Sequence, residues 1–342
     1  MHIGVVGCGA ISSVYLEELA RSKVVQVTAL ADRDMARAQA AASRWGGVAM
    51  SVEGLLASAE VDLVLNLTTP EAHEPLAMRA IEAGKHVYNE KPLCIDPAAG
   101  RALLQRAEAK GVRVGCAPDT VLGAGIQTSR QLVAEGVIGK VVGGVAFMLC
   151  PGHESWHPDP AFYYRRGGGP VLDMGPYYVT ALVSILGPVR MVHSVASRTR
   201  AKRTITSEPN RGRIIDVEVP THCVGMLEFG CGACVSITLS FDVHRSHCRN
   251  IELWGTQGTI AVPDPNTFAG PVRVFRQGGD DWSEADLVDA PVHNARGVGV
   301  EDMALAISEG RAHRCSGRLA LHVLEVMTAL TCSGSTPIDA GI

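Results

Sequence analysis

The chain has 342 residues, of which 46% are hydrophobic, and its formal net charge is −4. This length exceeds the roughly 250 to 300 residues at which a single hydrophobic core stops growing, so we expect two domains. The slightly acidic balance argues against nucleic acid or an anionic membrane as partner and favours a small molecule. The sequence shows no run approaching 18 apolar residues and no charged leader before an apolar segment. We therefore expect a soluble, cytoplasmic protein.

Ten cysteines are too few for a disulfide scaffold in a chain this long, and most lie in apolar runs, as reduced thiols do. Cys231 and Cys234 form one C-x-x-C pair, with no second pair to complete a zinc site. The pair falls between two alternating apolar runs, which favours a hairpin turn. The cluster His244 to Cys248 lacks ligand spacing, so we expect no metal.

The first 120 residues alternate short apolar runs with helical patterns. Such alternation is typical of a doubly wound parallel sheet with helices on both faces, an α/β dinucleotide-binding domain over residues 1–120. The expected strands are 2–7, 24–32, 61–69, 85–90 and 112–118, and the expected helices are 10–22, 35–46, 73–84 and 97–111.

From residue 121 the pattern changes to longer β-rich runs joined by turn residues, which predicts an α+β domain over 121–342 with a largely antiparallel sheet. Helices at 175–187 and 316–333 can cover only one face of that sheet. We expect the open face to be buried in a homo-oligomer, a dimer or a tetramer, because large apolar patches are rare on monomers. Residues 203–213 form the expected mobile loop.

The segment "GVVGCGAIS" contains Gly7, Gly9 and Ser12 in the spacing of a dinucleotide-binding turn, with Ala10 and Ile11 inside the turn. It follows the first expected strand and opens a helix. Asp32 comes twenty residues after Ser12, at the end of the second expected strand. A carboxylate there accepts hydrogen bonds from ribose hydroxyls and repels a 2′-phosphate, which favours NAD.

Arg33 directly follows Asp32 and keeps NADP open. Its guanidinium could meet a 2′-phosphate or stack on adenine, or it could be a solvated surface residue.

Two polar motifs follow the next expected strands. "TTPEAH" begins at Thr68 and "EKP" begins at Glu90. In a doubly wound sheet these strand ends border the crevice in which a nicotinamide binds. We also expect a cis peptide bond between Lys91 and Pro92, since the lysine must turn from the strand end into that crevice.

The motifs "GCGAIS", "TTPEAH", "EKPL" and "GGGPVLDMGPYY" together resemble the Gfo/Idh/MocA family of glucose-fructose oxidoreductases and inositol dehydrogenases, over nearly the whole chain. The resemblance implies that Lys91 contacts both the substrate hydroxyl and the nicotinamide ribose. It places the remaining cofactor contacts of this region at Thr68, Thr69, Pro70, His73 and Glu90. A surface ion pair between Glu90 and Lys91 is the alternative interpretation.

The second-domain motif supplies Asp173 and, four residues later, Tyr177, which share one face if the segment is helical. Similar inositol dehydrogenases carry a histidine base where this chain has Tyr177, and many relatives have an aspartate where it has Thr180. These two differences put specificity for inositol in doubt and leave sugar-like polyols as candidate substrates. A neighbouring ammonium would favour the phenolate that a tyrosine base requires. The alternative is that Tyr177 is a core aromatic.

The Pro-rich loop before this motif is rich in aromatic and hydrogen-bonding side chains, which suit a ring bearing several hydroxyls. Packing within the loop is the alternative. The candidate substrate-binding residues here are His153, Trp156, His157 and Tyr163, beside Lys91, Asp173 and Tyr177.

These observations predict an NAD-dependent dehydrogenase acting on a secondary alcohol of a sugar, inositol or related glycoside. Lys91, Asp173 and Tyr177 are the expected catalytic residues. One alternative is an NADP-linked enzyme acting on a keto-sugar or a dihydrodiol. Another is a sugar-sensing regulator on the same fold, because fold does not fix function.

Overall fold

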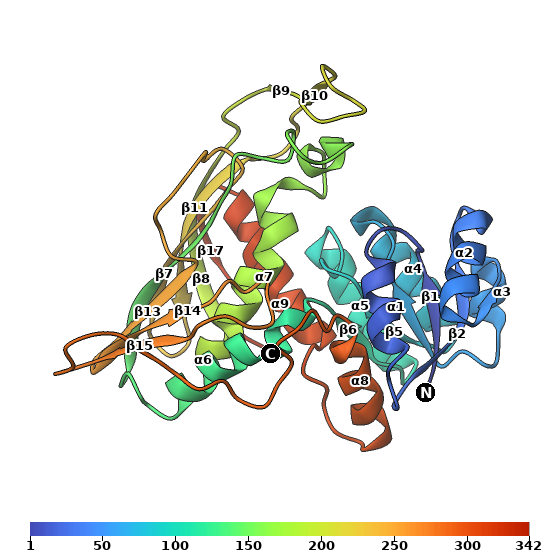
Figure 1. The fold of residues 1–342 in the computed structure, drawn as a ribbon, viewed down its shortest axis with the longest axis horizontal. Helices are drawn as coiled ribbons and strands as arrows, with labels where there is room; N and C mark the ends of the chain where they lie inside the picture. Colours follow the sequence, from blue (N-terminus) through green and yellow to red (C-terminus); the bar gives the residue numbers. More distant parts are fainter. Residues whose placement is uncertain (342) are drawn as a thin grey trace. The chain divides into compact units, whose positions relative to one another are not determined.

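The computed structural model describes residues 1–341, and these form two compact units. Unit 1 contains Met1–Leu122 and His293–Leu324, and unit 2 contains Gly123–Val292 and Glu325 onward. Figure 1 labels most of the helices and strands of each.

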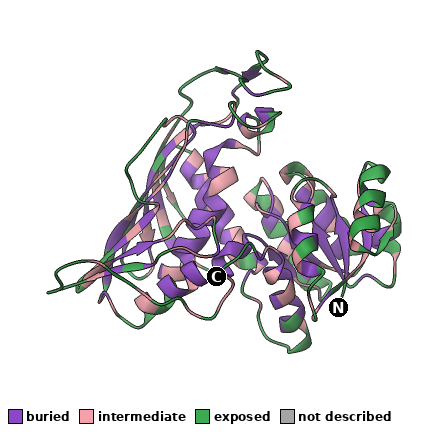
Figure 2. Cartoon of the chain, viewed as in Figure 1, coloured by how far each residue is buried: buried purple, intermediate pink, exposed green. Residues whose placement is uncertain are grey.

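Unit 1 is built on a six-stranded parallel sheet in the order β3-β2-β1-β4-β5-β6, the strand order of a Rossmann fold. The expected doubly wound sheet is confirmed. Its central strands β1 and β4 are apolar except for His2 at the start of β1 and Asn66 at the end of β4, as suits strands covered on both faces, and Figure 2 shows the strands of the sheet largely buried. The strands are β1 (His2–Val6), β2 (Gln26–Ala31), β3 (Val48–Ala49), β4 (Leu63–Asn66), β5 (His86–Asn89) and β6 (Val114–Cys116).

The helices of unit 1 begin where the sequence offers start signals. Asp34, Ser51 and Asp96 each cap a helix by accepting a backbone N–H, and Pro70 and Pro97 occupy first positions, where a missing N–H costs nothing. The helices are α1 (Ser12–Leu19), α2 (Met35–Trp45), α3 (Val52–Ala57), α4 (Pro70–Glu82) and α5 (Pro97–Ala109), followed by the short η1 (Asp119–Leu122).

The structure differs from the expected division of the chain in one respect. Residues 293–324, assigned from sequence to the second domain, are grouped with unit 1 and carry α8 (Val298–Ser308) and the first half of α9 (Gly317–Thr331). The backbone of this segment pairs with β6, where Cys116 N donates to Cys315 O at 3.0 Å. The buried Asp119 carboxylate accepts a hydrogen bond from Gly297 N at 2.6 Å. These long-range contacts attach the segment to unit 1.

Unit 2 is built on a nine-stranded, mostly antiparallel sheet in the order β16-β15-β14-β13-β7-β12-β11-β8-β17, as expected from sequence. One pair, β12 with β7, is parallel. The strands are β7 (Val141–Leu149), β8 (Val189–Ser197), β11 (His222–Phe229), β12 (Cys234–Ser240), β13 (Ile251–Gly255), β14 (Gly258–Val262), β15 (Arg273–Arg276), β16 (Ser283–Glu284) and β17 (Gly334–Pro337).

One face of this sheet is covered by helices. On α7 (Gly169–Leu186), a Cβ added to Gly175 would lie 3.0 Å from Met327 of α9 and 3.5 Å from Leu239 of β12, so both helices pack closely here. The other helical elements of the unit are α6 (Ala124–Ala134) and the short η2 (Pro160–Tyr164). The opposite face keeps exposed apolar side chains, namely Val195, Val224, Met226 and Trp254.

Two local expectations have counterparts in the structure. Cys231 lies in the turn between β11 and β12, and Cys234 begins β12, so the C-x-x-C pair marks a hairpin. Residues 203–213, expected as a loop, connect the small antiparallel pair β9 (Lys202–Thr204) and β10 (Ile214–Asp216) and include part of β9. Within residues 1–341, no helix is long and apolar enough to cross a membrane.

Candidate active site

The glycine turn after β1 has the geometry that a dinucleotide pyrophosphate requires. Gly7 has a positive φ of 99°, and a Cβ there would lie 2.7 Å from the backbone of Leu67, so only glycine fits. A Cβ on Gly9 would meet no described atom within 4 Å. Gly9 is exposed, which leaves room for a phosphate against the backbone.

The first turn of α1 is equally suited to an anion. Its N-cap residue, Ile11, provides no side-chain cap, although Ser12 N and Val14 N already donate to Gly9 O and Ile11 O. Ser12 donates from Oγ to Gly9 O at 2.7 Å and is buried, as the third motif position requires. Ala10 is exposed and Ile11 half-buried beside it. These residues fit a bound dinucleotide.

Asp32, at the end of β2, is held by two backbone donors. Cys8 N donates to its Oδ2 at 2.7 Å, and Asp34 N donates to its Oδ1 at 2.9 Å. These bonds fix the half-buried carboxylate beside the glycine turn, where each oxygen retains lone pairs for ribose hydroxyls. Arg33 is exposed.

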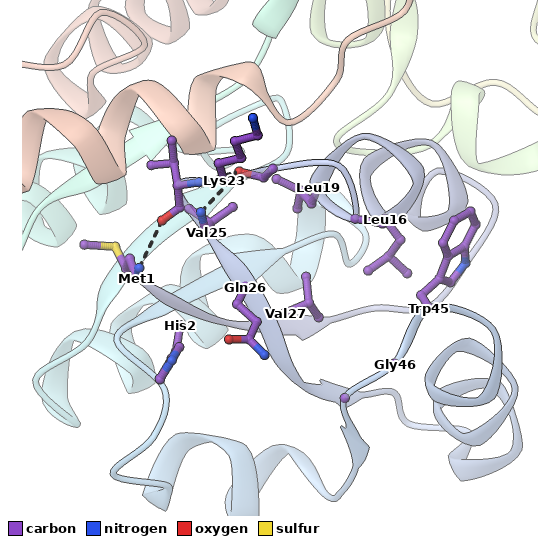
Figure 3. A pocket seen from close by; sticks show the side chains of 14 residues that line it. Met1, His2, Leu16, Leu19, Lys23, Val25, Gln26, Val27, Trp45 and Gly46 are labelled. Atoms are coloured by element: carbon purple, nitrogen blue, oxygen red, sulfur yellow. Dashed lines mark hydrogen bonds between the residues drawn. The ribbon is translucent and has the colours of Figure 1, made fainter.

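A cavity of about 520 Å³ lies at the other end of the same strands. Figure 3 shows Met1 and His2 at the start of β1 and Gln26 and Val27 at the start of β2, with Trp45 at the end of α2. Because ligands of doubly wound sheets bind beyond the carboxyl ends of the strands, this cavity is not the cofactor site.

The carboxyl ends of β4 and β5 carry a buried network of polar side chains. Asn66 donates from Nδ2 to Asn89 Oδ1 at 3.0 Å and accepts from Thr68 Oγ1 at 2.6 Å. Thr69 is exposed and precedes Pro70, the first residue of α4. The "TTP" turn is thereby joined to the strand that leads into the E-K-P motif.

His73 is the member of this network that faces no solvent. Its Nδ1 lies 2.7 Å from Pro92 O and its Nε2 lies 3.1 Å from Thr68 O, and the residue is fully buried. Burial lowers the pKa of this histidine, so the neutral ring predominates at neutral pH and donates one N–H. His73 therefore lies between the turn after β4 and the E-K-P turn and contacts a backbone carbonyl of each.

Lys91 is half-buried, and its peptide bond to Pro92 is cis, as the sequence predicts. Glu90 is only 8% exposed. A surface ion pair therefore does not describe this carboxylate.

In unit 2, α7 presents Asp173 and Tyr177, which are four residues apart. The helix that this spacing required is therefore present. Tyr177 is 7% exposed, and Thr180, one turn later, is also buried. Asp173 Oδ2 lies 3.8 Å from Nε2 of His153, which reaches it from the loop after β7.

His153 is the centre of an aromatic cluster. Its ring stacks on Tyr163, with centroids 3.9 Å apart and planes 17° apart, and the ring of Trp156 lies 5.4 Å away. His157 meets Tyr163 edge-on at 5.4 Å. Trp156 is 62% exposed and available to a ligand. The four loop residues predicted to bind substrate thus lie together, and His153 also contacts Asp173.

The environment of His153 favours its neutral form. Burial lowers the pKa of its ring, and the negative charge of Asp173 opposes this. Its Nδ1 is buried and has no hydrogen-bond partner among the described residues.

Sequence reasoning missed the residues that support this cluster. Phe241, directly after β12, is fully buried and contacts His153 edge-on at 4.5 Å. Arg203 of β9 is 5% exposed and pairs with Glu154 at 2.6 Å and with Asp242. The alternating pattern of β12 indicates burial of Phe241 but not its partner. No sequence pattern links Arg203 to Glu154.

Comparison with known proteins agrees with these features. Residues 1–117 match the family described as "Oxidoreductase family, NAD-binding Rossmann fold", and residues 126–261 match the "GFO/IDH/MocA C-terminal domain". The chain belongs to the Gfo/Idh/MocA oxidoreductase family. The predicted resemblance is confirmed, as is the prediction of an NAD(P)-dependent oxidoreductase.

Individual members of the Gfo/Idh/MocA family cover almost all of this chain. A dTDP-3,4-didehydro-2,6-dideoxy-alpha-D-glucose 3-reductase of Streptomyces violaceoruber is 32% identical over 90% of this chain and 85% of its own length. An inositol 2-dehydrogenase of Rhizobium meliloti is 23% identical over 96% and 95%. The crystal structure of an aldose-aldose oxidoreductase from Caulobacter crescentus, complexed with glycerol, has a TM-score of 0.82 at 21% identity, covering 99% of each chain.

Proposed function

We propose that this member of the Gfo/Idh/MocA family oxidises a secondary alcohol of a sugar, inositol or related glycoside with NAD. The observation that carries the substrate class is the loop cluster beside Asp173. Its exposed indole and stacked His153–Tyr163 pair offer an apolar surface and polar tips to a hydroxylated ring. The sugar and inositol substrates named for relatives support the same class.

The backbone-held Asp32 carries the cofactor preference. Its carboxylate would accept hydrogen bonds from both ribose hydroxyls and would repel a 2′-phosphate. When bound at the glycine turn, the nicotinamide cofactor supplies the acceptor for the hydride released from the carbinol carbon.

Three side chains of the protein would serve the reaction. Lys91 orients and polarises the alcohol oxygen, Asp173 positions the substrate, and Tyr177 accepts the hydroxyl proton.

The test is a cofactor-reduction screen of the purified protein with D-glucose, D-xylose, myo-inositol and methyl glucosides, using NAD and NADP separately. We expect NADH formation with at least one of these polyols. Lys91→Ala should abolish it, and Lys91→Arg should not restore it, because a guanidinium is larger and differs in geometry. Turnover by Lys91→Ala close to that of wild type would refute the proposed role of the lysine.

The reverse reaction is the second candidate. The relative that is 32% identical is named as a reductase of a dTDP-linked keto-sugar, and the exposed Arg33 beside Asp32 could meet a 2′-phosphate. Steady-state assays with NADPH and a keto-sugar distinguish this function from the first.

A further inference from the structure

The carboxylate of Glu90 is held on two sides at the carboxyl end of β5. Its Oε1 accepts a hydrogen bond from the hydroxyl of Tyr15 at 2.9 Å, and its Oε2 accepts one from the backbone N–H of Lys91 at 2.7 Å. Because Glu90 is buried, water competes weakly for either oxygen. The orientation of the carboxylate therefore depends on both partners.

Tyr15 reaches Glu90 from α1, the helix that begins at the glycine turn. Its side chain is fully buried, so its hydroxyl has a fixed position. Tyr15 lies one turn after Ser12, which is hydrogen-bonded to Gly9. One short helix thus joins the pyrophosphate-binding turn to the carboxylate that holds Lys91.

We propose that Tyr15 is a positioning residue for Lys91 and acts through the carboxylate of Glu90. This inference rests on the catalytic role of Lys91 proposed above. The phenol fixes one oxygen of Glu90, and the other oxygen then fixes the amide from which the lysine side chain departs. Without the phenol the carboxylate rotates, and the lysine ammonium moves relative to the alcohol oxygen.

The rest of the E-K-P turn is held independently of Tyr15. Glu90 N donates to Asn66 O at 2.8 Å, Asn89 Nδ2 donates to Leu93 O at 3.0 Å, and His73 contacts Pro92 O. Removing one hydroxyl should therefore leave the fold of the turn intact. The expected loss lies in the alignment of Lys91 and not in folding.

The test is Tyr15→Phe, with Tyr88→Phe as its matched control. Tyr88 is also fully buried in unit 1, and its hydroxyl also donates to a carboxylate, that of Asp119. Turnover is measured with NAD and whichever polyol of the screen gives the highest rate. Tyr15→Phe should lower kcat about 10- to 100-fold, the range expected when a catalytic group is misplaced by up to 1 Å. KM for NAD should change less than twofold, and Tyr88→Phe should retain kcat within threefold.

A double-mutant cycle shows whether the effect passes through Glu90. In a Glu90→Ala background, Tyr15→Phe should change kcat less than twofold, because residues that act as one unit are not additive. The inference would be overturned if Tyr15→Phe left kcat unchanged, or if Tyr88→Phe lowered kcat as much as Tyr15→Phe does. It would also be overturned if Tyr15→Phe lowered kcat as much in the Glu90→Ala background as in the wild-type protein. If Lys91→Ala abolishes turnover while Tyr15→Phe does not lower it, this inference alone fails. If Lys91→Ala is active, the proposed function of Lys91 fails with it.

Discussion

At the scale of single residues, two adjacent tyrosines of α7 have different surroundings. The hydroxyl of Tyr178 accepts a hydrogen bond from Asn250 Nδ2 at 2.7 Å, and burial raises the pKa of this phenol. Tyr178 is therefore a structural residue. Tyr177 follows Asp173 by four positions on the helix, so the two side chains share one face of α7.

Tyr177→Phe should lower turnover by about 10²- to 10⁴-fold, the usual loss for a general base, with NAD affinity little changed. Tyr178→Phe is the control, since it removes the same atom from the neighbouring side chain, and it should stay within a few-fold of wild type. The measurement is the steady-state turnover of both variants and of wild type on the polyol identified in the screen. Activity of Tyr177→Phe near that of wild type would show that Tyr177 only packs. The proton would then leave through Lys91 or through a histidine such as His153.

Asp32→Ala should weaken NAD binding and relax discrimination against NADP, since the variant loses the proposed hydrogen bonds to the ribose and the repulsion of a 2′-phosphate. Asp34→Ala is the control, because the Asp34 carboxylate caps α2 instead. Dissociation constants for both cofactors test this. Wild-type protein that binds NADP tenfold more tightly than NAD, about 1.4 kcal/mol, would contradict the assignment and make Arg33 the phosphate ligand.

At the scale of elements, the two glycines of the turn after β1 have different expected roles. Gly7 is required for folding, and Gly9 is expected to be required for binding the ligand. Gly7→Ala should destabilise the protein, because φ is positive and the Leu67 backbone blocks a Cβ. Gly9→Ala should fold normally but lose most of its affinity for NAD, since the added methyl would occupy the space proposed for the phosphate. Thermal unfolding and NAD titration of both variants test this contrast. Normal NAD affinity in Gly9→Ala would exclude this turn as the pyrophosphate site.

We expect the attachment of the segment before α8 to η1 to depend on pH. Burial raises the pKa of Asp119 from 3.8 to about 6, although Tyr88 and Gly297 donate hydrogen bonds to its carboxylate. A raised pKa in the folded state gives stability that is complete below pH 3.8 and is lost as pH rises through 6. Asp119 should therefore stabilise the protein by about 1–2 kcal/mol more at pH 5 than at pH 8.

Urea unfolding of wild type and Asp119→Asn at the two pH values measures this contribution. The variant side chain does not titrate, so its stability should fall less between pH 5 and pH 8 than that of wild type. Equal pH dependence of the two proteins would show that Asp119 is not the titrating group.

Features that depend on residues close together in the sequence could be predicted from it, whereas features that depend on contacts between distant residues could not. Local periodicity and start signals were sufficient for the parallel sheet, the cofactor turn and α7. Residues 298–308 were not predicted as a helix because Gly297 offers no side-chain cap and Gly299 weakens the helical pattern. Gly299 is needed because an added Cβ would lie 2.0 Å from the Tyr88 hydroxyl, a contact between residues far apart in sequence. The contact of His153 with Asp173 crosses an irregular loop and has no periodic signature.

At the scale of the whole molecule, the uncovered face of the unit 2 sheet predicts self-association. Val195 of β8 and Val224 of β11 are cross-strand partners and are 67% and 42% exposed. Apolar side chains on neighbouring strands form a patch that a second copy of the chain could cover. Light scattering at micromolar concentration should show a dimer or a tetramer.

The double variant Val195→Glu, Val224→Glu should shift the protein toward monomer, because buried charges oppose association. Val292→Glu is the control, since Val292 is 58% exposed and lies outside the strands of the sheet. A wild-type protein that is monomeric throughout would contradict the prediction. Equal dissociation by the control variant would place the interface elsewhere.

The division of unit 1 into two stretches of chain has a consequence for the order of synthesis. A ribosome releases Met1–Leu122 first, then the whole of Gly123–Val292, and only then His293–Leu324. Domains generally fold as units during translation, but this nucleotide-binding domain lacks its closing segment until nearly the entire chain has emerged. During that interval Asp119 has neither Gly297 nor the cover of α8. The nascent chain must therefore carry an incomplete Rossmann domain while the sheet of unit 2 is being made.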